Sequence, residues 1–307
     1  MFFSCYFVKV FFKKMQKHYL SLLLSLICSF LQAQNLTLSG GGGAVSGAMG
    51  GISTALADEW AVFNNIGALA ANENLVPNAM FAFENRFGIK EFNSYHLGFL
   101  SPFNFGGVGG LTFNRFGDKT YNETKIGLGY SHQISLISVG AKINYFQIAV
   151  DDQIGVTQGA RGTFVIELGG RANLSKKWSV GIYGYNFTQS KLRVLDAGED
   201  RIPVILKTGV GYQPYGKLFL SIETEKNLDY PATVRAGVNY QIHQNFFVRT
   251  GISTQPFNSS FGIGFQPKNF SLDYAIGNSS VLGWTNQISI RYAIKQLKTK
   301  QESVSDE

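Results

Sequence analysis

Glycines near the start of the chain are spaced closely enough to suggest a loop that cradles a phosphate. The stretch GGGGAVSGAMGG (residues 40–51) contains a dinucleotide-like set of them. A phosphate-binding loop follows a strand, or ends in a Gly-Lys-Ser/Thr pattern whose lysine reaches the phosphates. No strand-like segment precedes these glycines and no such lysine follows them. The motif context therefore argues against a nucleotide site.

Histidines offer the next candidate chemistry. His96, His132 and His243 are present, but no serine or carboxylate lies near them at a recognisable motif spacing. A catalytic triad is recognised by geometry rather than by order along the chain, so a lipase or acyltransferase stays open as an alternative at this stage. No clustered His, Cys and Asp pattern resembles a metal site. We expect no enzymatic activity, no metal and no cofactor.

Charged residues share one face of many alternating segments. In ATVRAGVNY (residues 232–240), Val234, Ala236 and Val238 alternate with Thr233 and Arg235. Successive strand side chains point to opposite faces, so this alternation predicts a strand with one apolar face. The charged residues on the non-aliphatic faces, which we expect to face a lumen, are Lys142, Glu167, Arg171, Lys207, Glu223, Arg235, Arg249, Asp273 and Arg291.

Alternation of this kind recurs in about fourteen segments separated by polar turns. Turn sequences such as QPYG (213–216) and QPKN (266–269) end the segments, and the longer connections 150–162 and 188–202 are expected to be loops. The predicted strands cover residues 79–87, 94–100, 107–115, 122–131, 137–148, 163–174, 178–187, 203–212, 218–225, 232–241, 246–253, 260–266, 270–276 and 286–294.

Charge partition favours a membrane barrel over a soluble β-sandwich. A Lys or Arg facing lipid at mid-membrane costs about 2–4 kcal/mol, and all the charges above avoid the aliphatic face. A sandwich gives no reason for an even run of hairpin-linked strands without a helix. We predict an all-β fold: a transmembrane antiparallel β-barrel of about 14 strands over residues 79–294. Aromatic residues near strand ends resemble the girdles of such barrels: Tyr130, Tyr145, Trp178, Tyr212, Tyr240 and Tyr292.

The first 33 residues have the features of a secretory signal peptide. The basic KKMQK precedes a 12-residue apolar run, Leu20 to Leu31, which is too short to cross a bilayer, and cleavage is expected after Ala33. Both cysteines, Cys5 and Cys28, fall inside this segment, so the exported chain needs no disulfide. Met1 and Met15 both stay open as the start. The polar residues 295–307 are expected to form a disordered tail.

Net charge excludes one class of partner. The formal charge of +7 includes four lysines of residues 1–33, which leaves +3 for the exported chain. No basic stripe with exposed aromatics stands out, so nucleic acid is not an expected partner.

Residues 34–78 remain to be placed. A barrel of fourteen strands is too wide for its own side chains to fill, so we expect this segment to form a hatch or plug, with a short helix over 56–63. A flexible periplasmic leader is the alternative, although it does not account for the apolar residues. The candidate hatch or ligand-binding residues are Met49, Leu56, Asp58, Trp60, Phe63, Asn64, Asn65 and Leu69.

The same segment carries a family resemblance. GAMGGISTALADEWAVFNNIGALA resembles the N-terminal signature of the FadL-like outer-membrane proteins, and more closely that of their PorV and PorQ relatives. The matching residues are 49–51, 55–58 and 65–70, and FENRF (83–87) and VLGWTNQISIRY (281–292) are also similar to family segments. Ile66, Gly67 and Ala68 replace the family's Pro-Ala-Gly, and proline restricts the backbone, so the turn that seats the plug is not assumed to be identical.

This resemblance implies a fourteen-stranded barrel with an N-terminal hatch, in the outer membrane of a Gram-negative bacterium. It implies transport or binding of hydrophobic small molecules, although the polar lumen expected here weakens the case for a wholly apolar channel. The alternative is a non-transporting component of a type IX secretion or surface-assembly system, whose partner is a secretion-system protein. An apolar tunnel through the hatch favours transport, and a sealed hatch favours assembly. Outer-membrane lipid is a partner in both cases.

Overall fold

The computed structural model describes residues 41–151, 160–194 and 198–294, which belong to one compact unit, Leu36–Glu307. The predicted signal peptide and the predicted polar tail lie outside these residues. Within them, no helix is both long and apolar enough to cross a membrane.

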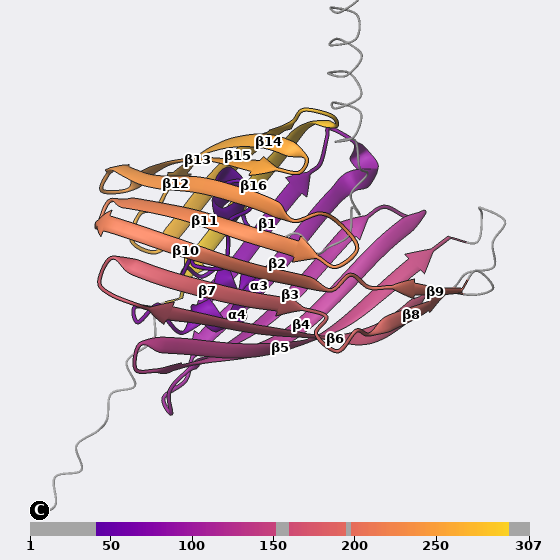
Figure 1. Cartoon of the computed structure of the whole chain (residues 1–307), viewed down its shortest axis with the longest axis horizontal. Helices are drawn as coiled ribbons and strands as arrows, with labels where there is room; N and C mark the ends of the chain where they lie inside the picture. Colours follow the sequence, from indigo (N-terminus) through magenta and orange to yellow (C-terminus); the bar gives the residue numbers. More distant parts are fainter. Residues whose placement is uncertain (1–40, 152–159, 195–197, 295–307) are drawn as a thin grey trace, which may run out of the picture. The chain divides into compact units, whose positions relative to one another are not determined.

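Strands dominate the unit (Figure 1). Of the sixteen strands in the described residues, fourteen close into one antiparallel barrel, which confirms the predicted fold class. The ring closes where β1 pairs with β16, with Asn78 opposite Ala293. The barrel strands are β1 (Asn78–Asn85), β2 (Asn93–Pro102), β3 (Val108–Gly117), β4 (Tyr121–Ile134), β5 (Ile137–Val150), β6 (Arg161–Asn173), β7 (Trp178–Tyr185), β10 (Ile205–Tyr215), β11 (Leu218–Asn227), β12 (Thr233–His243), β13 (Phe246–Thr254), β14 (Phe257–Phe265), β15 (Phe270–Ser279) and β16 (Gly283–Ala293).

Connections differ between the two ends of the barrel. At one end the hairpins are tight, as at Ser135–Leu136 and Gly216–Lys217. At the other end the β1–β2 connection contains the 3-10 helix η1 (Lys90–Phe92), and the β7–β10 connection contains β8 (Lys191–Val194) and β9 (Gly198–Arg201). The prediction of a plain loop over 188–202 was therefore wrong in part, because strands of four residues are too short to show an alternating pattern.

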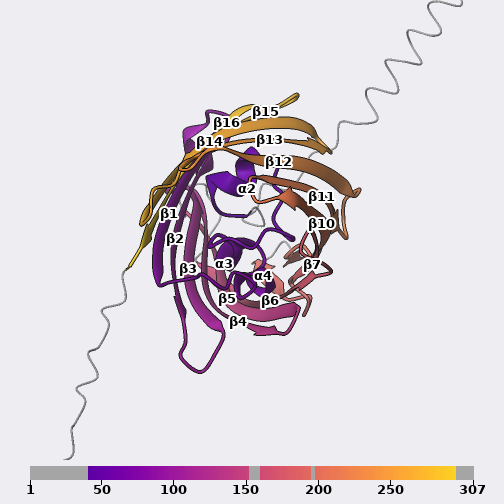
Figure 2. The same cartoon turned by 90° about the vertical axis from the view of Figure 1, so that its left-hand side faces the viewer.

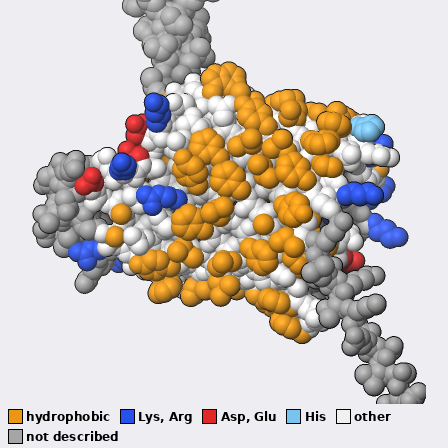
Figure 3. Space-filling model, turned by 180° about the vertical axis from the view of Figure 1, so that it is seen from behind, with side chains coloured by type: hydrophobic (Ala, Val, Ile, Leu, Met, Phe, Trp, Pro, Cys, Tyr) orange, Lys and Arg blue, Asp and Glu red, His pale blue; other side chains and the backbone are white. Residues whose placement is uncertain are grey.

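The outer face of the barrel is apolar. Alternate residues of β4 and β5 point outward, and Leu128 and Ile143 are exposed while Lys125 and Lys142 are buried on the inner side. Figure 3 shows apolar side chains spread over the wall, with the charged side chains gathered toward its two ends. Exposed apolar surface of this extent is stable against lipid rather than water, so the barrel is transmembrane.

Residues 41–77, here called the inner segment, lie inside the ring of strands (Figure 2). They form three short helices, α2 (Ala44–Ala48), α3 (Ala61–Asn64) and α4 (Ile66–Leu69). The side chain of Asn65 accepts a hydrogen bond from the backbone N–H of Gly67 (3.2 Å), which caps the start of α4. The helix predicted over 56–63 begins only at Ala61. Helix α2 was not predicted, because Gly43 precedes it and Gly47 lies within its five residues.

Candidate functional site

The inner segment follows the barrel wall around its circumference. Helix α2 packs on β13 to β16, α3 on β2 and β3, and α4 on β4 to β6. Between α2 and α3, Met49 lies against β12 and β13, and Thr54 lies against β7 and β10. The segment therefore contacts the wall on all sides rather than crossing the lumen at one place.

Glycines of the wall allow the inner segment to approach it closely. A Cβ atom at Gly251 would overlap the backbone of Met49, one at Gly181 would overlap the backbone of Thr54, and one at Gly67 would overlap the backbone of Gly169. Absence of a side chain lets two backbones approach directly. The sequence analysis missed this feature, although its signal was available as glycines in the inward phase of β6, β7 and β13.

Glu223 on β11 anchors the turn before α3. Its Oε2 accepts hydrogen bonds from the backbone N–H of Ser53 (2.8 Å), from the backbone N–H of Thr54 (2.7 Å) and from Thr54 Oγ1 (2.8 Å). The carboxylate is fully buried, and hydrogen bonds to a buried charged group are stronger than neutral ones. This carboxylate fixes the register of the inner segment against β11.

Basic residues of the wall hold other parts of the inner segment. Lys142 Nζ donates to the carbonyl of Val62 (3.1 Å), and Arg171 Nε donates to the carbonyl of Ala55 (2.9 Å). Arg291 forms an ion pair with Glu59 (3.1 Å). Lys142, Arg171, Glu223 and Arg291, four of the nine charged residues expected to face the lumen, thus contact the inner segment through hydrogen bonds or ion pairs.

The other five pair mainly with each other or with neighbours along the wall. Glu167 pairs with Lys142 (2.8 Å) and Arg249 with Asp273 (2.7 Å). Glu225, which the sequence analysis did not single out, pairs with both Lys207 (3.0 Å) and Arg235 (2.8 Å). Glu225 shares the inward phase of Glu223, so strand alternation could have identified it.

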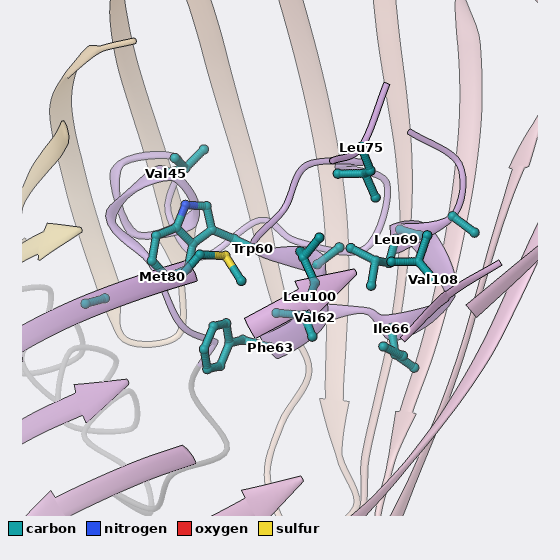
Figure 4. Packing of buried hydrophobic residues seen from close by; sticks show 14 residues of the cluster. Val45, Trp60, Val62, Phe63, Ile66, Leu69, Leu75, Met80, Leu100 and Val108 are labelled. Carbon is teal, nitrogen blue, oxygen red and sulfur yellow. The ribbon is translucent and has the colours of Figure 1, made fainter. Parts of the chain in front are cut away.

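Apolar residues of α3 and α4 form a cluster with the walls of β1 to β3, here called the inner-segment cluster (Figure 4). The rings of Trp60 and Phe63 stack at 5.7 Å between centroids, and Phe63 meets the edge of His96 at 5.9 Å. Its buried members include Val45, Trp60, Phe63, Leu69, Met80, Leu100 and Val108, and the partly buried Leu56 packs against them.

The structure does not bring all the candidate residues together. Leu56, Trp60, Phe63 and Leu69 share the inner-segment cluster, whereas Met49 is buried against Gly237 and Gly251 on the wall. The two asparagines form hydrogen bonds within the inner segment. Asn64 Nδ2 donates to the carbonyl of Gly42 (3.1 Å), and Asn65 Nδ2 donates to the carbonyl of Thr54 (2.7 Å).

Asp58 belongs to a charged group with Glu59 of the inner segment and Arg249, Asp273 and Arg291 of the wall. One of its carboxylate oxygens is buried and accepts no hydrogen bond within the described residues. Burial is the main cause that raises the pKa of Asp58 from 3.8 to about 7, with a smaller contribution from the neighbouring Glu59. Asp58 lies outside the membrane-spanning strands and is the candidate residue most sensitive to pH.

The three histidines of the described residues contact neighbouring polar and aromatic side chains. His96 Nδ1 lies 2.6 Å from Asn114 Oδ1, His132 stacks on Tyr130, and His243 lies beside Phe246. Across residues 41–151, 160–194 and 198–294, no group of three His, Cys, Asp or Glu side chains is placed to hold a metal ion.

No protein-family model matches the sequence, and no curated protein matches it either. Solved structures do match. The toluene transporter TodX of Pseudomonas putida superposes with a TM-score of 0.61 at 13% identity, over 84% of this chain and 98% of that one. The toluene transporter TbuX of Ralstonia pickettii gives 0.61 at 12% identity, over 83% and 99%.

A FadL homologue of Pseudomonas aeruginosa superposes with a TM-score of 0.57 at 12% identity, over 81% of this chain and 98% of that one. Sequence identity at this level supports an argument about the fold and not about the substrate. The fourteen-stranded barrel is therefore FadL-like in fold.

Proposed function

We propose that the protein admits small hydrophobic molecules through the outer membrane of a Gram-negative bacterium. The observation that carries this proposal is the inner-segment cluster: aromatic side chains of Trp60 and Phe63 inside a barrel whose fold matches toluene transporters. Apolar pockets with few polar groups are the usual sites for such ligands. In this proposal the inner segment is the hatch, and Trp60 and Phe63 contact the passing molecule.

Location in the outer membrane is supported by two features. The lipid-facing surface is apolar, and the sequence begins with a segment of signal-peptide type. Closed barrels of antiparallel strands satisfy every backbone hydrogen bond without an edge strand, which is what a bilayer requires.

Movement of the hatch is limited by its anchors. Glu223, Arg171 and Lys142 hold backbone groups of residues 53–62, and breaking a buried charged hydrogen bond costs about 1.5–3 kcal/mol. The side chains of the inner-segment cluster make apolar contacts, which are not directional, unlike the hydrogen bonds of the anchors. We infer that passage proceeds by rearrangement of these side chains, with the anchored backbone in place.

A second candidate function is a non-transporting barrel that serves secretion or surface assembly, as the likeness to PorV and PorQ implies. The observation in its favour is the backbone contact of the inner segment with the wall at Gly169, Gly181 and Gly251. Close backbone contact of this kind favours a closed lumen.

Uptake of radiolabelled toluene separates the two candidates. The barrel is expressed in a Gram-negative host that lacks hydrocarbon channels, with heat-modifiable migration on gels as the check of folding. We expect several-fold faster uptake than in vector cells, and a change in that rate with Trp60→Ala. Trp178→Ala is the matched control, because Trp178 lies on the lipid-facing side and is exposed.

Uptake equal to that of vector cells, by a folded barrel, contradicts the transport proposal. Isolation of the barrel with a stoichiometric protein partner would then support the assembly role.

A further inference from the structure

The six hairpin turns at the end of the barrel with tight connections carry lysines but no acidic residue. These turns all lie within the described residues and cover 103–107, 135–136, 174–177, 216–217, 244–245 and 266–269. Three of them, on the arc of the ring from β6 to β15, contain four exposed lysines: Lys176, Lys177, Lys217 and Lys268. We call these four side chains the lysine arc.

Charges of both signs occur at the opposite end of the barrel. Lys90 and Glu91 are neighbours in the β1–β2 connection, and Asp118 and Lys119 are neighbours in the β3–β4 connection. In Figure 3, blue side chains gather at the right-hand end of the wall, whereas blue and red lie together at the left-hand end. At the lysine end, Glu73 is exposed in the segment that leads into β1, outside the six turns. The lysine arc therefore carries positive charge that its own turns do not balance.

Hydrogen bonds hold two of the lysine-bearing turns against the next strand. The carbonyl of Lys177 accepts from the backbone N–H of Gln213 (2.8 Å), and the carbonyl of Lys217 accepts from that of Gln241 (2.8 Å). Within the first turn, Ser175 Oγ accepts from the backbone N–H of Lys177 (3.2 Å). The backbone of these turns is thus fixed to the barrel, and the flexible lysine side chains are the part that adapts to a partner.

Lipid-facing aromatic residues lie near each lysine-bearing turn. Trp178 directly follows Lys177 and stacks on Tyr212, with ring centroids 4.3 Å apart. Phe265 is exposed at the end of β14, just before the turn that contains Lys268. Trp and Tyr concentrate at the level of the lipid headgroups in membrane proteins. The lysine arc therefore lies at the depth where ammonium groups meet lipid phosphates.

We propose that the lysine arc binds the headgroups of anionic phospholipids in the periplasmic leaflet of the outer membrane. Short turns face the periplasm in bacterial barrels, which places this end of the barrel in that leaflet. An acidic protein would approach from the aqueous side, whereas the neighbouring aromatic residues face lipid. One lysine near a membrane surface contributes about fivefold to the affinity for anionic lipid. This inference goes beyond the proposed function and does not depend on transport.

Quenching of tryptophan fluorescence by brominated lipids tests this site. Trp178 borders the lysine arc, Trp284 is exposed near the start of β16 at the opposite end, and Trp60 is buried inside the barrel. Trp284→Phe therefore leaves Trp178 as the lipid-exposed tryptophan, and Trp178→Phe leaves Trp284. The full-length barrel is refolded into phosphatidylcholine vesicles that contain brominated phosphatidylglycerol or brominated phosphatidylcholine. Both leaflets have the same composition, so the direction of insertion does not affect the comparison.

We expect phosphatidylglycerol to reach Trp178 with about fivefold higher apparent affinity than phosphatidylcholine, and to show no such preference at Trp284. Lys176→Gln/Lys177→Gln removes both charges of the turn before Trp178 and should bring the ratio of affinities close to one. Lys90→Gln/Lys119→Gln is the matched control, because it removes two exposed charges from the opposite end and should leave the preference at Trp178 unchanged. High salt should also weaken this preference, since exposed charges are screened.

Equal quenching of Trp178 by the two lipids, in a barrel that migrates as folded on gels, overturns the proposal. The same conclusion follows if Lys176→Gln/Lys177→Gln keeps the preference, or if Trp284 shows it equally, because the selectivity would then not belong to the lysine arc. If Trp284→Phe fails to fold, the lysine variants are compared with all three tryptophans in place. The buried Trp60 then gives a constant background, and loss of the lipid preference in the Lys176→Gln/Lys177→Gln protein alone still supports the proposal.

Discussion

The two apolar clusters in the lumen are held in different ways. The inner-segment cluster is carried by a backbone that buried charged residues fix at several points, including Glu223 and Lys142. The second cluster joins Phe116, Phe146, Tyr183 and Tyr185 of the wall to Leu192 and Ile202 of the β7–β10 connection, which Asn186 braces internally. Directional polar contacts specify one arrangement, whereas apolar contacts tolerate exchange of one partner for another. The comparison shows a hatch held by polar anchors and a second cluster held by apolar contacts.

The largest expected effect comes from the glycines beneath the fixed hatch. Gly251→Val would place a side chain into the backbone of Met49, which cannot move aside without losing its other wall contact at Gly237. We expect a loss of more than about 3 kcal/mol in the free energy of unfolding, the upper range for overpacking. The measurement is the fraction of heat-modifiable, folded barrel after refolding into lipid vesicles.

Gly277→Val is the matched control for this substitution. Gly277 lies on the neighbouring part of the wall, and the nearest atom to its Cβ position is the carbonyl oxygen of Ser259 at 4.0 Å. Equal loss of folding in both variants would mean that valine in any of these strands is harmful, and that the close approach of the hatch plays no part.

A smaller effect is expected from the carboxylate anchor. Glu223→Ala leaves two backbone N–H groups and the Thr54 hydroxyl without their buried acceptor. Removing one partner of a buried charged contact costs about 3–5 kcal/mol, and we expect a loss near the lower end because the barrel strands stay intact. Urea unfolding in vesicles measures it. Glu223→Gln keeps one acceptor oxygen and should lose less; an equal loss would show that charge, not hydrogen bonding, holds the turn.

Strand alternation predicted the wall well because each barrel strand repeats the same local signal. Leu128 and Ile143 face lipid and Lys142 faces inward. The alternation of apolar and polar residues along each strand already indicates these directions. The second cluster could not be predicted in this way. Leu192 and Ile202 share a buried cluster with Phe116 through folding of a connection, and the cluster joins residues far apart in the sequence.

The inner segment shows an intermediate case. Its place in the barrel was predicted from the lumen that a wide barrel must fill, and its apolar residues suggested a hatch. Which wall residue meets which part of it depends on the barrel register, so the partnership of Glu223 with Thr54 had no local signal. Gly169 and Gly181 did carry one, since inward-facing glycines in strands indicate a close approach by another backbone.

The smallest effect concerns Asp58, a carboxyl of the hatch. Burial, with Glu59 and Asp273 adding to it, raises the pKa of Asp58 from 3.8 to about 7, while Arg249 and Arg291 oppose the shift. A raised carboxyl pKa means that the folded state holds a proton which the unfolded state has lost. Its contribution to stability is therefore complete below pH 3.8 and is lost as the pH rises through about 7.

Asp58→Asn tests this directly, because asparagine mimics the protonated carboxyl at every pH. The two proteins should have the same melting temperature near pH 4, and the variant should melt higher than the wild type at pH 8. Asp229→Asn, in the exposed β11–β12 connection, controls for the loss of a negative charge. A constant difference between wild type and Asp58→Asn across this range would show that Asp58 stays ionised. The hatch would then be held at Asp58 by charge pairing with Arg249 and Arg291, and the contrast between the polar anchoring of the hatch and the apolar second cluster would become sharper.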